Sequence, residues 1–329
     1  MSGIKESSNG SFSLKDAGFT RELSRDPALT GKVEPARVSF TSRNKYKLIT
    51  AKGEKWATLT GSLRREGKVP LVGDWVAVDT GANPAIRSLL KRKNLLKRGA
   101  AGGRKREGEA VPMQNIAANI DKIFILCGLD RDYNPPRIAR YTVLSELCGA
   151  TPIVILNKAD LCDEARAREE EIKGLLPSVE VKALSAAEGD VGWIKGQINP
   201  GETICLLGSS GAGKSTLINA LIGGEAQKTA AVSEALGKGR HTTTHRELFI
   251  LPSGGIIIDN PGMREITLPD EALEDAEVFS IIDELARGCK FRDCKHVSEP
   301  GCSVLDAVQA GEIAREAVEK YSKLKGQEQ

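Results

Sequence analysis

The fold of this chain is decided by the stretch Gly208-Ser209-Ser210-Gly211-Ala212-Gly213-Lys214-Ser215, which is followed by Thr216. It matches the pattern G-x-x-x-x-G-K-[ST], in which a glycine-rich loop turns its backbone N–H groups toward phosphate oxygens. The apolar residues 203–207 predict a buried strand before the loop, and residues 216–221 predict a helix after it. The alternative, a glycine turn before a structural helix, fits this context less well. We therefore expect residues 208–216 to bind nucleotide phosphates, with Lys214 at the β and γ phosphates and Ser215 on Mg²⁺.

A second motif, Asn157-Lys158-Ala159-Asp160, indicates which base is bound. It follows the apolar residues 152–156, which predict a strand, and ligands of open α/β sheets bind at that carboxyl edge. The Asp160 carboxylate can accept hydrogen bonds from guanine N1–H and N2–H₂, Asn157 can brace the loop, and the Lys158 stem can lie over the ring. Alone, the tetrapeptide would more often be a helix-capping turn; beside a phosphate loop it predicts GTP. Ser185 lies in the small-residue run 185–187. The position of this run in the sequence is the only indication that it forms a loop that supports the base.

Two segments after the phosphate loop supply candidate Mg²⁺ and γ-phosphate contacts. The polar run 239–245 contains Thr243 and Thr244, either of which can offer a hydroxyl to Mg²⁺, and the residues do not choose between them. Residues 255–258 predict a strand that ends at Asp259, which can hold Mg²⁺ through water, and the Gly262 N–H can meet the γ phosphate. A solvated loop and a plain β-turn are the alternatives for these two segments.

The N-terminal part of the chain is basic, whereas the rest is acidic. Residues 31–110 carry 19 Lys and Arg against 7 Asp and Glu, a net charge of +12, while the whole chain carries +3, which leaves −9 elsewhere. Short strand patterns at 38–40, 46–50, 56–60 and 74–78 predict a small barrel, best matched by the oligonucleotide-binding (OB) type. Its aromatic and basic residues suit RNA, although a barrel with a solvated charged face is the alternative. The clusters at 91–93 and 104–106 predict a flexible basic connector and a further RNA contact.

Cys289, Cys294, His296 and Cys302 form a C-x₄-C-x-H-x₅-C cluster near the C-terminus. Three thiolates and one imidazole make a closed tetrahedral zinc site with no open position, so we expect one Zn²⁺ with a folding role. Three reduced cysteines in a loop are the alternative. The remaining cysteines, which lie in or near apolar segments, are expected to be free structural thiols: Cys127, Cys148, Cys162 and Cys205.

Composition fits an intracellular protein of more than one domain. No apolar run reaches the roughly 18 residues that a membrane span needs, and the polar first 30 residues lack the apolar core of a secretory signal. We expect no membrane association, a cytoplasmic location and a monomer. The expected organisation is a disordered tail (1–34), an OB-type β-barrel with its connector (35–111), an α/β P-loop domain (112–272) and an α-helical zinc-knuckle domain (273–329) with helices over 273–285 and 305–324.

The order of these motifs, with the base-reading tetrapeptide before the phosphate loop, resembles the circularly permuted GTPases and most of all the family of GTPases that depend on the small ribosomal subunit. The run 239–244, the segment 259–262 and the cysteine cluster strengthen this resemblance, although Asn260 stands where Thr or Ser is commoner. The resemblance implies a GTPase that binds the small subunit and its rRNA, assists its late maturation, hydrolyses GTP to GDP and phosphate, and is then released. A GTP-gated RNA-binding protein with incidental turnover is the alternative, and an unrelated P-loop nucleotidase is disfavoured by Asp160.

The residue that positions the attacking water is not the usual one. Ras-type enzymes carry a glutamine directly after the glycine of the second switch, whereas this chain has Met263, which offers no suitable donor or acceptor. The family resemblance implies that His241, just before the threonine run, takes this catalytic role. His245 is the weaker candidate. Because the second switch leads directly into the C-terminal domain, we also expect nucleotide state to set the placement of that domain against the barrel.

Overall fold

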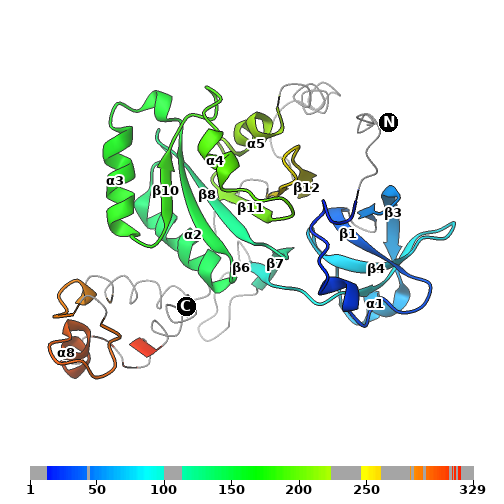
Figure 1. Cartoon of the computed structure of the whole chain (residues 1–329), viewed down its shortest axis with the longest axis horizontal. Coiled ribbons are helices and arrows are strands. Elements are labelled where there is room, and N and C mark those ends of the chain that lie inside the picture. Colours follow the sequence, from blue (N-terminus) through cyan, green and yellow to red (C-terminus); the bar gives the residue numbers. More distant parts are fainter. Residues whose placement is uncertain are drawn as a thin grey trace, which may run out of the picture. The chain divides into compact units, whose positions relative to one another are not determined.

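The chain divides into two compact units, one made of residues 1–97 with 114–266 and the other of residues 98–113 with 267–329. The computed structural model describes residues 13–42, 45–99, 113–223, 246–260, 285–291 and 294–310, together with positions 282, 313, 315, 318 and 319 (Figure 1). The first unit holds both the barrel and the phosphate loop, and the second holds the cysteine cluster.

Five strands close into the N-terminal barrel. They are β1 (Glu34–Thr41), β2 (Tyr46–Thr50), β3 (Gly53–Leu59), β4 (Trp75–Asp79) and β5 (Ala85–Leu89). Strand pairing runs β1-β2-β3-β5-β4 and returns to β1, with the short helix α1 (Gly61–Arg65) between β3 and β4. Alternate side chains fill the interior, among them Val38, Leu48 and Val76, each fully buried. The predicted barrel is confirmed, and β5 is a strand that the sequence reading missed.

Residues 13–33 differ from the predicted disordered tail. The turn 13–18, the 3₁₀ segment η1 (Leu23–Arg25) and one ring contact order this stretch. Ala17 is fully buried, and the Phe19 ring lies 4.9 Å from the Trp75 ring of β4. The segment is polar apart from a few such residues, so its composition predicted disorder over residues that the structure shows to be ordered. Residues 1–12 lie outside the described part of the chain.

The first half of the basic connector is also more ordered than predicted. Strand β6 (Leu95–Gly99) pairs with β7 (Met113–Ala118) in a separate two-stranded sheet. Arg92 makes two 2.7 Å hydrogen bonds to the buried Asp74 carboxylate, and Lys93 lies 2.5 Å from Asp121. These ion pairs fix the polypeptide where flexibility was expected, because the cations have fixed carboxylate partners. The second basic cluster, 104–106, lies outside the described residues.

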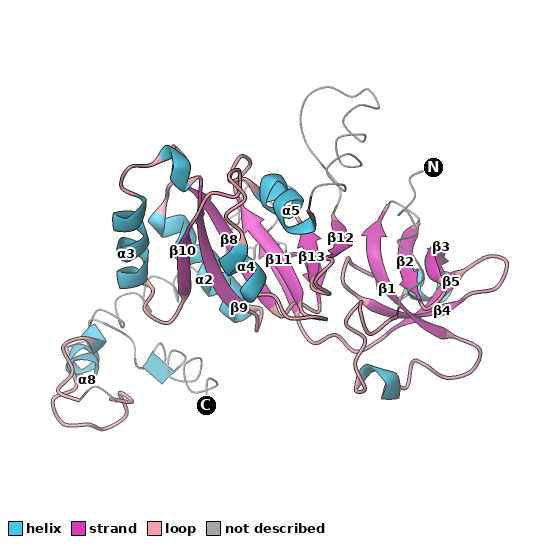
Figure 2. Ribbon diagram, turned by 45° about the horizontal axis from the view of Figure 1, so that its top comes forward, coloured by secondary structure: helices cyan, strands magenta, loops and turns pink. Residues whose placement is uncertain are grey.

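The phosphate-loop domain is a mostly parallel sheet (Figure 2). Its strands are β8 (Lys122–Gly128), β9 (Thr151–Asn157), β10 (Glu180–Ala183), β11 (Thr203–Gly208), β12 (Glu247–Ile250) and β13 (Ile256–Asp259). They are ordered β10-β9-β8-β11-β13-β12, and β12 alone among them is antiparallel to its neighbour β13. This arrangement confirms the predicted α/β sheet. It also brings the carboxyl ends of β8, β9 and β11 side by side.

Helices cover both faces of this sheet. Helices α4 (Gly192–Gly196) and α5 (Lys214–Ile222) contribute to the core cluster that contains Phe124 and Leu126 of β8. The alternate residues Ile123 and Ile125 are equally buried and belong to the opposite face, since side chains alternate along a strand. Helices α2 (Pro135–Leu147) and α3 (Ala165–Leu175) pack against β8, β9 and β10. None of the helices that the structure describes combines the length and apolarity needed to cross a membrane.

The barrel and the phosphate-loop sheet are joined through β1. Strand β12 pairs with β1, with Phe40 opposite Glu247, so eleven strands form one continuous hydrogen-bonded sheet. Next to this junction the guanidinium of Arg37, also on β1, is buried and donates to Thr203 Oγ1 of β11 at 2.7 Å and to the Gly73 carbonyl at 3.3 Å. Its Nη1 donates to the Ala17 carbonyl at 2.5 Å. Burial lowers the pKa of Arg37 to about 10, so the side chain still carries its charge at neutral pH.

The second unit is built around the cysteine cluster. Its helix α8 (Ser303–Gln309) has Cys302 as its N-cap residue and overlaps the start of the predicted helix 305–324. The buried side chains of Ile282, Val304 and Val318 form a small core against which Cys289 and Cys294 pack. Most of the predicted helix 273–285 falls outside the described residues, so an α-helical C-terminal domain stays a prediction.

Replacing Arg37 tests how strongly it joins the two domains. We expect Arg37→Ala to lower the free energy of unfolding by roughly 2–5 kcal/mol, because it leaves buried acceptors unpaired and opens a cavity. Arg37→Lys should rescue little of this loss, since one ammonium cannot reproduce the planar fork of donors. Urea unfolding followed by tryptophan fluorescence measures the change.

The matched control for this test is Arg65→Ala, which removes an exposed arginine at the end of α1. Its effect should stay within about 0.5 kcal/mol. An Arg37→Ala protein as stable as the parent would show that the buried guanidinium does not hold the barrel to the sheet.

Candidate functional site

The phosphate loop lies between β11 and α5 in a conformation that requires its glycines. Gly208 has φ +153°, and a Cβ there would come within 2.5 Å of the Leu126 carbonyl oxygen of β8. Gly213 has φ +95°, and a Cβ there would lie 2.1 Å from Asn157 Nδ2. Any side chain at either position would push the loop away from its neighbours. These two glycines therefore let the loop approach β8 and the base-reading motif closely.

Lys214 is folded back over the loop. Its Nζ donates to the carbonyls of Gly208 at 2.8 Å and Ser209 at 2.6 Å, and the side chain is buried. Burial lowers the pKa of Lys214, while the negative charges of Asp259 and Asp132 oppose that change. The ammonium is thus held inside the loop where phosphate oxygens would lie. Ser215 and Thr216 follow it, exposed, in the first turn of α5.

Asp259, which the sequence predicts to hold Mg²⁺ through water, is the last residue of β13. Burial raises the pKa of its carboxyl, and the nearby Lys214 charge lowers it. The next residue, Asn260, is buried, with Nδ2 2.8 Å from Cys205 Sγ, and its Oδ1 has no hydrogen-bond partner among the residues that the structure describes. A hydroxyl oxygen and a carboxylate are hard ligands of the kind Mg²⁺ prefers, so Ser215 and Asp259 suit that ion.

The side chain of Asn157 connects three segments of the site. Its Nδ2 donates to the Ala212 carbonyl of the phosphate loop at 2.9 Å, and its Oδ1 accepts from the Ala186 N–H at 3.0 Å. Ala159 N–H donates to the Leu184 carbonyl at 3.1 Å, which adds a backbone link to the same small-residue loop. The base-reading motif, the phosphate loop and the loop 185–187 are therefore brought together, as the sequence reading expected of a single site.

The remaining base-site candidates differ in exposure. Asp160, in the 3₁₀ turn η2 (Ala159–Leu161), has an exposed carboxylate, whereas Ser185 is buried and accepts from the Glu188 N–H at 3.3 Å. Lys158 has a left-handed backbone, with φ +65°. A non-glycine residue in that conformation is retained only where its surroundings favour it, and such residues cluster at ligand sites.

Four other candidate residues fall outside the described part of the chain. They are His241, Thr243, Thr244 and Gly262. Met263 and His245 lie outside it as well. Their proposed roles in water positioning, Mg²⁺ binding and γ-phosphate contact stay predictions.

The loop 129–134, between β8 and α2, is a part of this site that the sequence reading missed. Its Asp132 Oδ1 accepts from Ser209 Oγ of the phosphate loop at 2.6 Å, and Asp130 Oδ2 lies 2.6 Å from Lys158 Nζ. One sequence feature could have predicted this part of the site: the two acidic residues come directly after an apolar segment that forms a buried parallel strand. Ligands bind at that edge of α/β sheets, so charged residues there are candidates for a site.

In the second unit, the cysteine cluster has the geometry of a metal centre. One ligand atom from each of Cys289, Cys294, His296 and Cys302 lies within 4.8 Å of the others. The Sγ atoms of Cys289 and Cys302 are 3.7 Å apart, and His296 Nδ1 lies 3.7 and 3.3 Å from those two sulfurs. A tetrahedron with Zn–S bonds of about 2.3 Å has S–S edges of about 3.8 Å, so these residues fit Zn²⁺.

The peptide around the cluster supports that arrangement. Glu299 accepts backbone N–H groups from Lys295 and Val297 at 2.9 Å and from Ser298 at 3.0 Å, and these bonds lower the pKa of its carboxyl. Leu305 N–H points to Cys302 Sγ at 3.5 Å, which links the metal ligand to the first turn of α8. The site is thereby part of the small core of this unit.

The chain is similar to known GTPases. The model of the family described as RsgA GTPase matches residues 89–269. A small ribosomal subunit biogenesis GTPase RsgA from Syntrophotalea carbinolica is 44% identical over 298 residues, which cover 88% of this chain and 82% of that protein.

Two solved structures resemble the chain in fold. YjeQ from Thermotoga maritima is 26% identical, with a TM-score of 0.57 over 89% of this chain and 97% of that one. YloQ, described as a circularly permuted GTPase, is 21% identical, with a TM-score of 0.52 over 92% and 98% of the two chains. The circularly permuted arrangement inferred from the motif order is confirmed as the fold.

Removing one ligand tests the metal centre. We expect Cys294→Ser to reduce bound zinc to well below one ion per chain and to loosen the second unit, because structural zinc binding and local folding are coupled. Elemental analysis of the purified protein and limited proteolysis of the C-terminal unit measure these two effects.

Cys162→Ser, which removes a half-buried thiol outside the cluster, is the matched control and should leave the zinc content unchanged. Full zinc stoichiometry in Cys294→Ser, with an unaltered thermal transition, would contradict the assignment of three cysteines and one histidine.

Proposed function

We propose that this chain, which belongs to the RsgA GTPase family, hydrolyses GTP to GDP and phosphate on the small ribosomal subunit during its late maturation and is then released. Members of the family are GTPases, hydrolases that act on GTP. The observation that carries the proposal is the pair of hydrogen bonds from the Asn157 side chain, which tie the loop containing Asp160 to the phosphate loop. One nucleotide can therefore be read at its base and held at its phosphates.

Base recognition is assigned to the loop after β9. The exposed Asp160 carboxylate is available to accept both guanine N1–H and N2–H₂, an array that adenine does not present. The Lys158 stem would cover one face of the ring, and Ser185 and Ala186 would support the other side of the pocket. Asn157 does not need to read the base, because its amide is already committed to aligning the three loops.

Phosphate binding is assigned to the phosphate loop and the start of α5. The backbone N–H groups of 208–215 and the Lys214 ammonium would replace part of the solvation of the β and γ phosphates. Ser215 and Asp259 would hold Mg²⁺, with Thr243 or Thr244 as the further protein ligand. Bound there, Mg²⁺ neutralises charge that builds up on the phosphate oxygens.

The barrel is the proposed contact for ribosomal RNA. The Trp56 ring on β3 is 50% exposed and lies edge-on to Phe40 of β1, with their ring centroids 6.0 Å apart. Lys47 of β2 is the cross-strand partner of Trp56, so its partly exposed side chain lies on the same face as the ring. An exposed aromatic ring beside basic side chains can stack on unpaired bases and contact phosphates. A cytoplasmic location and a monomeric state are part of the same proposal.

Substituting Asp160 tests base recognition. Asp160→Asn should weaken GDP binding by roughly 10- to 150-fold, because a charge-assisted hydrogen bond contributes about 1.5–3 kcal/mol. Calorimetric titration with GDP and ADP gives both affinities. A preference for guanine that is unchanged in Asp160→Asn would remove Asp160 from the base site.

Substituting His241 tests the chemistry and its dependence on the ribosome. Single-turnover hydrolysis of GTP should be faster with isolated small subunits than without them. His241→Ala should slow the stimulated rate by about 10²–10⁴-fold with little change in GTP affinity, since positioning water matters in the transition state. Met263→Ala is the comparison and should have a smaller effect, because Met263 offers the water no hydrogen bond.

The other outcomes are equally informative. If His245→Ala hydrolyses GTP slowly and His241→Ala hydrolyses it at the parent rate, His245 is the residue that positions the water. If subunits do not stimulate turnover but do bind the GTP form, the chain is a GTP-gated binding protein whose hydrolysis is incidental.

A further inference from the structure

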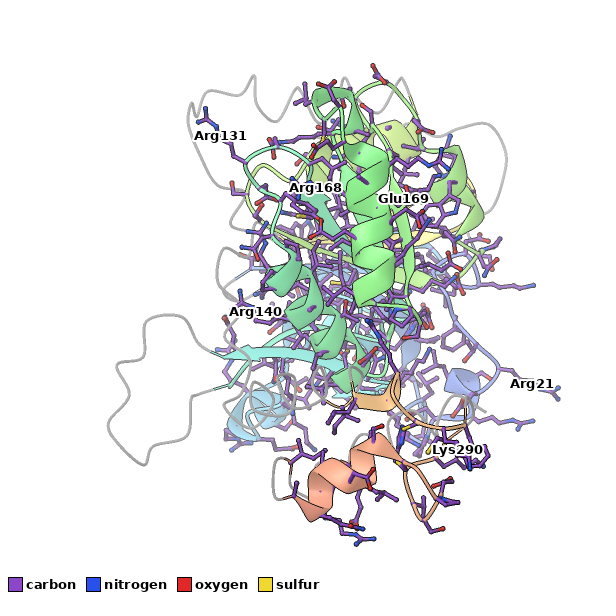
Figure 3. All side chains as sticks on the ribbon, turned by 90° about the vertical axis from the view of Figure 1, so that its left-hand side faces the viewer. Arg21, Arg131, Arg140, Arg168, Glu169 and Lys290 are labelled. Carbon is purple, nitrogen blue, oxygen red and sulfur yellow. The ribbon has the colours of Figure 1, made fainter. Side chains whose placement is uncertain are left out.

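The loop 129–134, here called the acidic loop, contacts both halves of the candidate nucleotide site. Asp130 pairs with Lys158 of the base-reading motif, with 2.6 Å between Oδ2 and Nζ, and both side chains are partly buried. Asp132 accepts the hydroxyl of Ser209 in the phosphate loop at 2.6 Å. Arg131 lies between them in sequence and projects outward from the loop (Figure 3).

The acidic loop is held in place by several independent contacts. Leu129 N–H donates to the Asn157 carbonyl at 2.8 Å, and the Asp132 carboxylate forms a 2.7 Å ion pair with Arg137 of α2. Tyr133 OH donates to Glu171 of α3 at 2.7 Å. The guanidinium of Arg168, labelled on α3 in Figure 3, lies 4.7 Å from the Tyr133 ring. A loop fixed to two helices and a neighbouring strand presents Asp130 at a defined place.

The backbone makes room for the Asp130–Lys158 pair. A Cβ at Gly128, the last residue of β8, would come within 2.6 Å of Asp130 Oδ1 and 3.4 Å of Lys158 Cδ. Asp130 Oδ1 also accepts the Asp132 N–H at 3.1 Å, which fixes the carboxylate's orientation and leaves Oδ2 for Lys158. Lys158 itself has the left-handed backbone noted above. Three local features therefore converge on the placement of one lysine side chain.

We propose that Asp130 is a positioning residue for base recognition: its carboxylate pins the ammonium of Lys158 and so presents the methylene stem of Lys158 to the purine ring. The inference rests on the proposed function, in which that stem covers guanine. A lysine stem is flexible, and an unpinned one would have to be ordered when nucleotide binds. With the ammonium already paired, that ordering occurs before the nucleotide arrives. Asp132 joins the same loop to Ser209, so the base and phosphate subsites share one support.

A double-mutant cycle on the full chain tests this role, with GDP affinity measured by calorimetric titration. Asp130→Asn should weaken GDP binding by about 1.5- to 5-fold, the range expected for a partly exposed ion pair. In the Lys158→Ala background the same substitution should change the affinity by less than about 1.5-fold, because its partner is gone. Asp130→Glu, which keeps the carboxylate, should restore most of the lost affinity.

Asp163→Asn is the matched control, since it removes an exposed carboxylate close to the base-reading motif. It should leave GDP affinity unchanged. An equal loss from Asp130→Asn in both backgrounds, or no loss in either, overturns the positioning role. Thermal melts identify any variant that is merely unfolded, and Asp130→Ala then takes the place of Asp130→Asn in the cycle with Lys158→Ala.

The result also separates this inference from the proposed function. If Asp160→Asn abolishes the preference for guanine while Asp130→Asn has no effect, only the positioning role fails. If the parent protein shows no preference for GDP over ADP, the base site itself is wrong and the role of Asp130 fails with it.

Discussion

The amide of Asn157 is the constraint on which the nucleotide site depends. In this permuted chain the base-reading loop precedes the phosphate loop by more than 40 residues. The strand order brings the two loops to the same edge of the sheet, but it does not fix the distance between them as closely as a hydrogen bond does. The amide fixes that distance with one donor and one acceptor, both buried and both used. Gly213 must be glycine for the same reason, because a Cβ would occupy the space of the Asn157 side chain. A buried polar group stabilises a unique arrangement only when it is fully paired.

A second buried polar group, Arg37, has the corresponding role between the domains. It extends from a barrel strand to the amino-terminal end of β11, the strand whose other end begins the phosphate loop. Most of its hydrogen-bond partners are backbone carbonyls. The contact therefore depends on how the surrounding backbone is folded, and it does not need a particular acidic side chain. The barrel is consequently part of the scaffold that supports the phosphate loop. The surface proposed to bind RNA and the candidate nucleotide site are thus built on one sheet.

Much of this architecture could be predicted from the sequence, and the reasons for the exceptions are physical. Strand β2 follows from the strand pattern over 46–50, and the phosphate loop with its flanking strand and helix follows from the glycines and the apolar residues around them. The order of segment 13–33 was not predicted because its apolar anchors are few, namely Ala17 and Phe19, and its hydrogen bond from the Lys91 N–H to Asp26 joins residues far apart in sequence. Charge counts suggested a mobile connector, yet Arg92 is fixed by Asp74, a residue distant in sequence. The contacts of Asp130 and Asp132 were equally hidden, since pairing across neighbouring loops leaves no periodic pattern.

The pairing of β12 with β1 has a consequence for how the protein can be divided. An edge strand exposes a row of unsatisfied backbone donors and acceptors, which other chains readily join by strand addition. Here the barrel covers that edge of the phosphate-loop sheet. Removing the barrel would leave β12 as an unpaired edge strand of the remaining domain, and that fragment would be prone to self-association and aggregation. The N-terminal barrel therefore also keeps the phosphate-loop domain soluble by covering its edge strand.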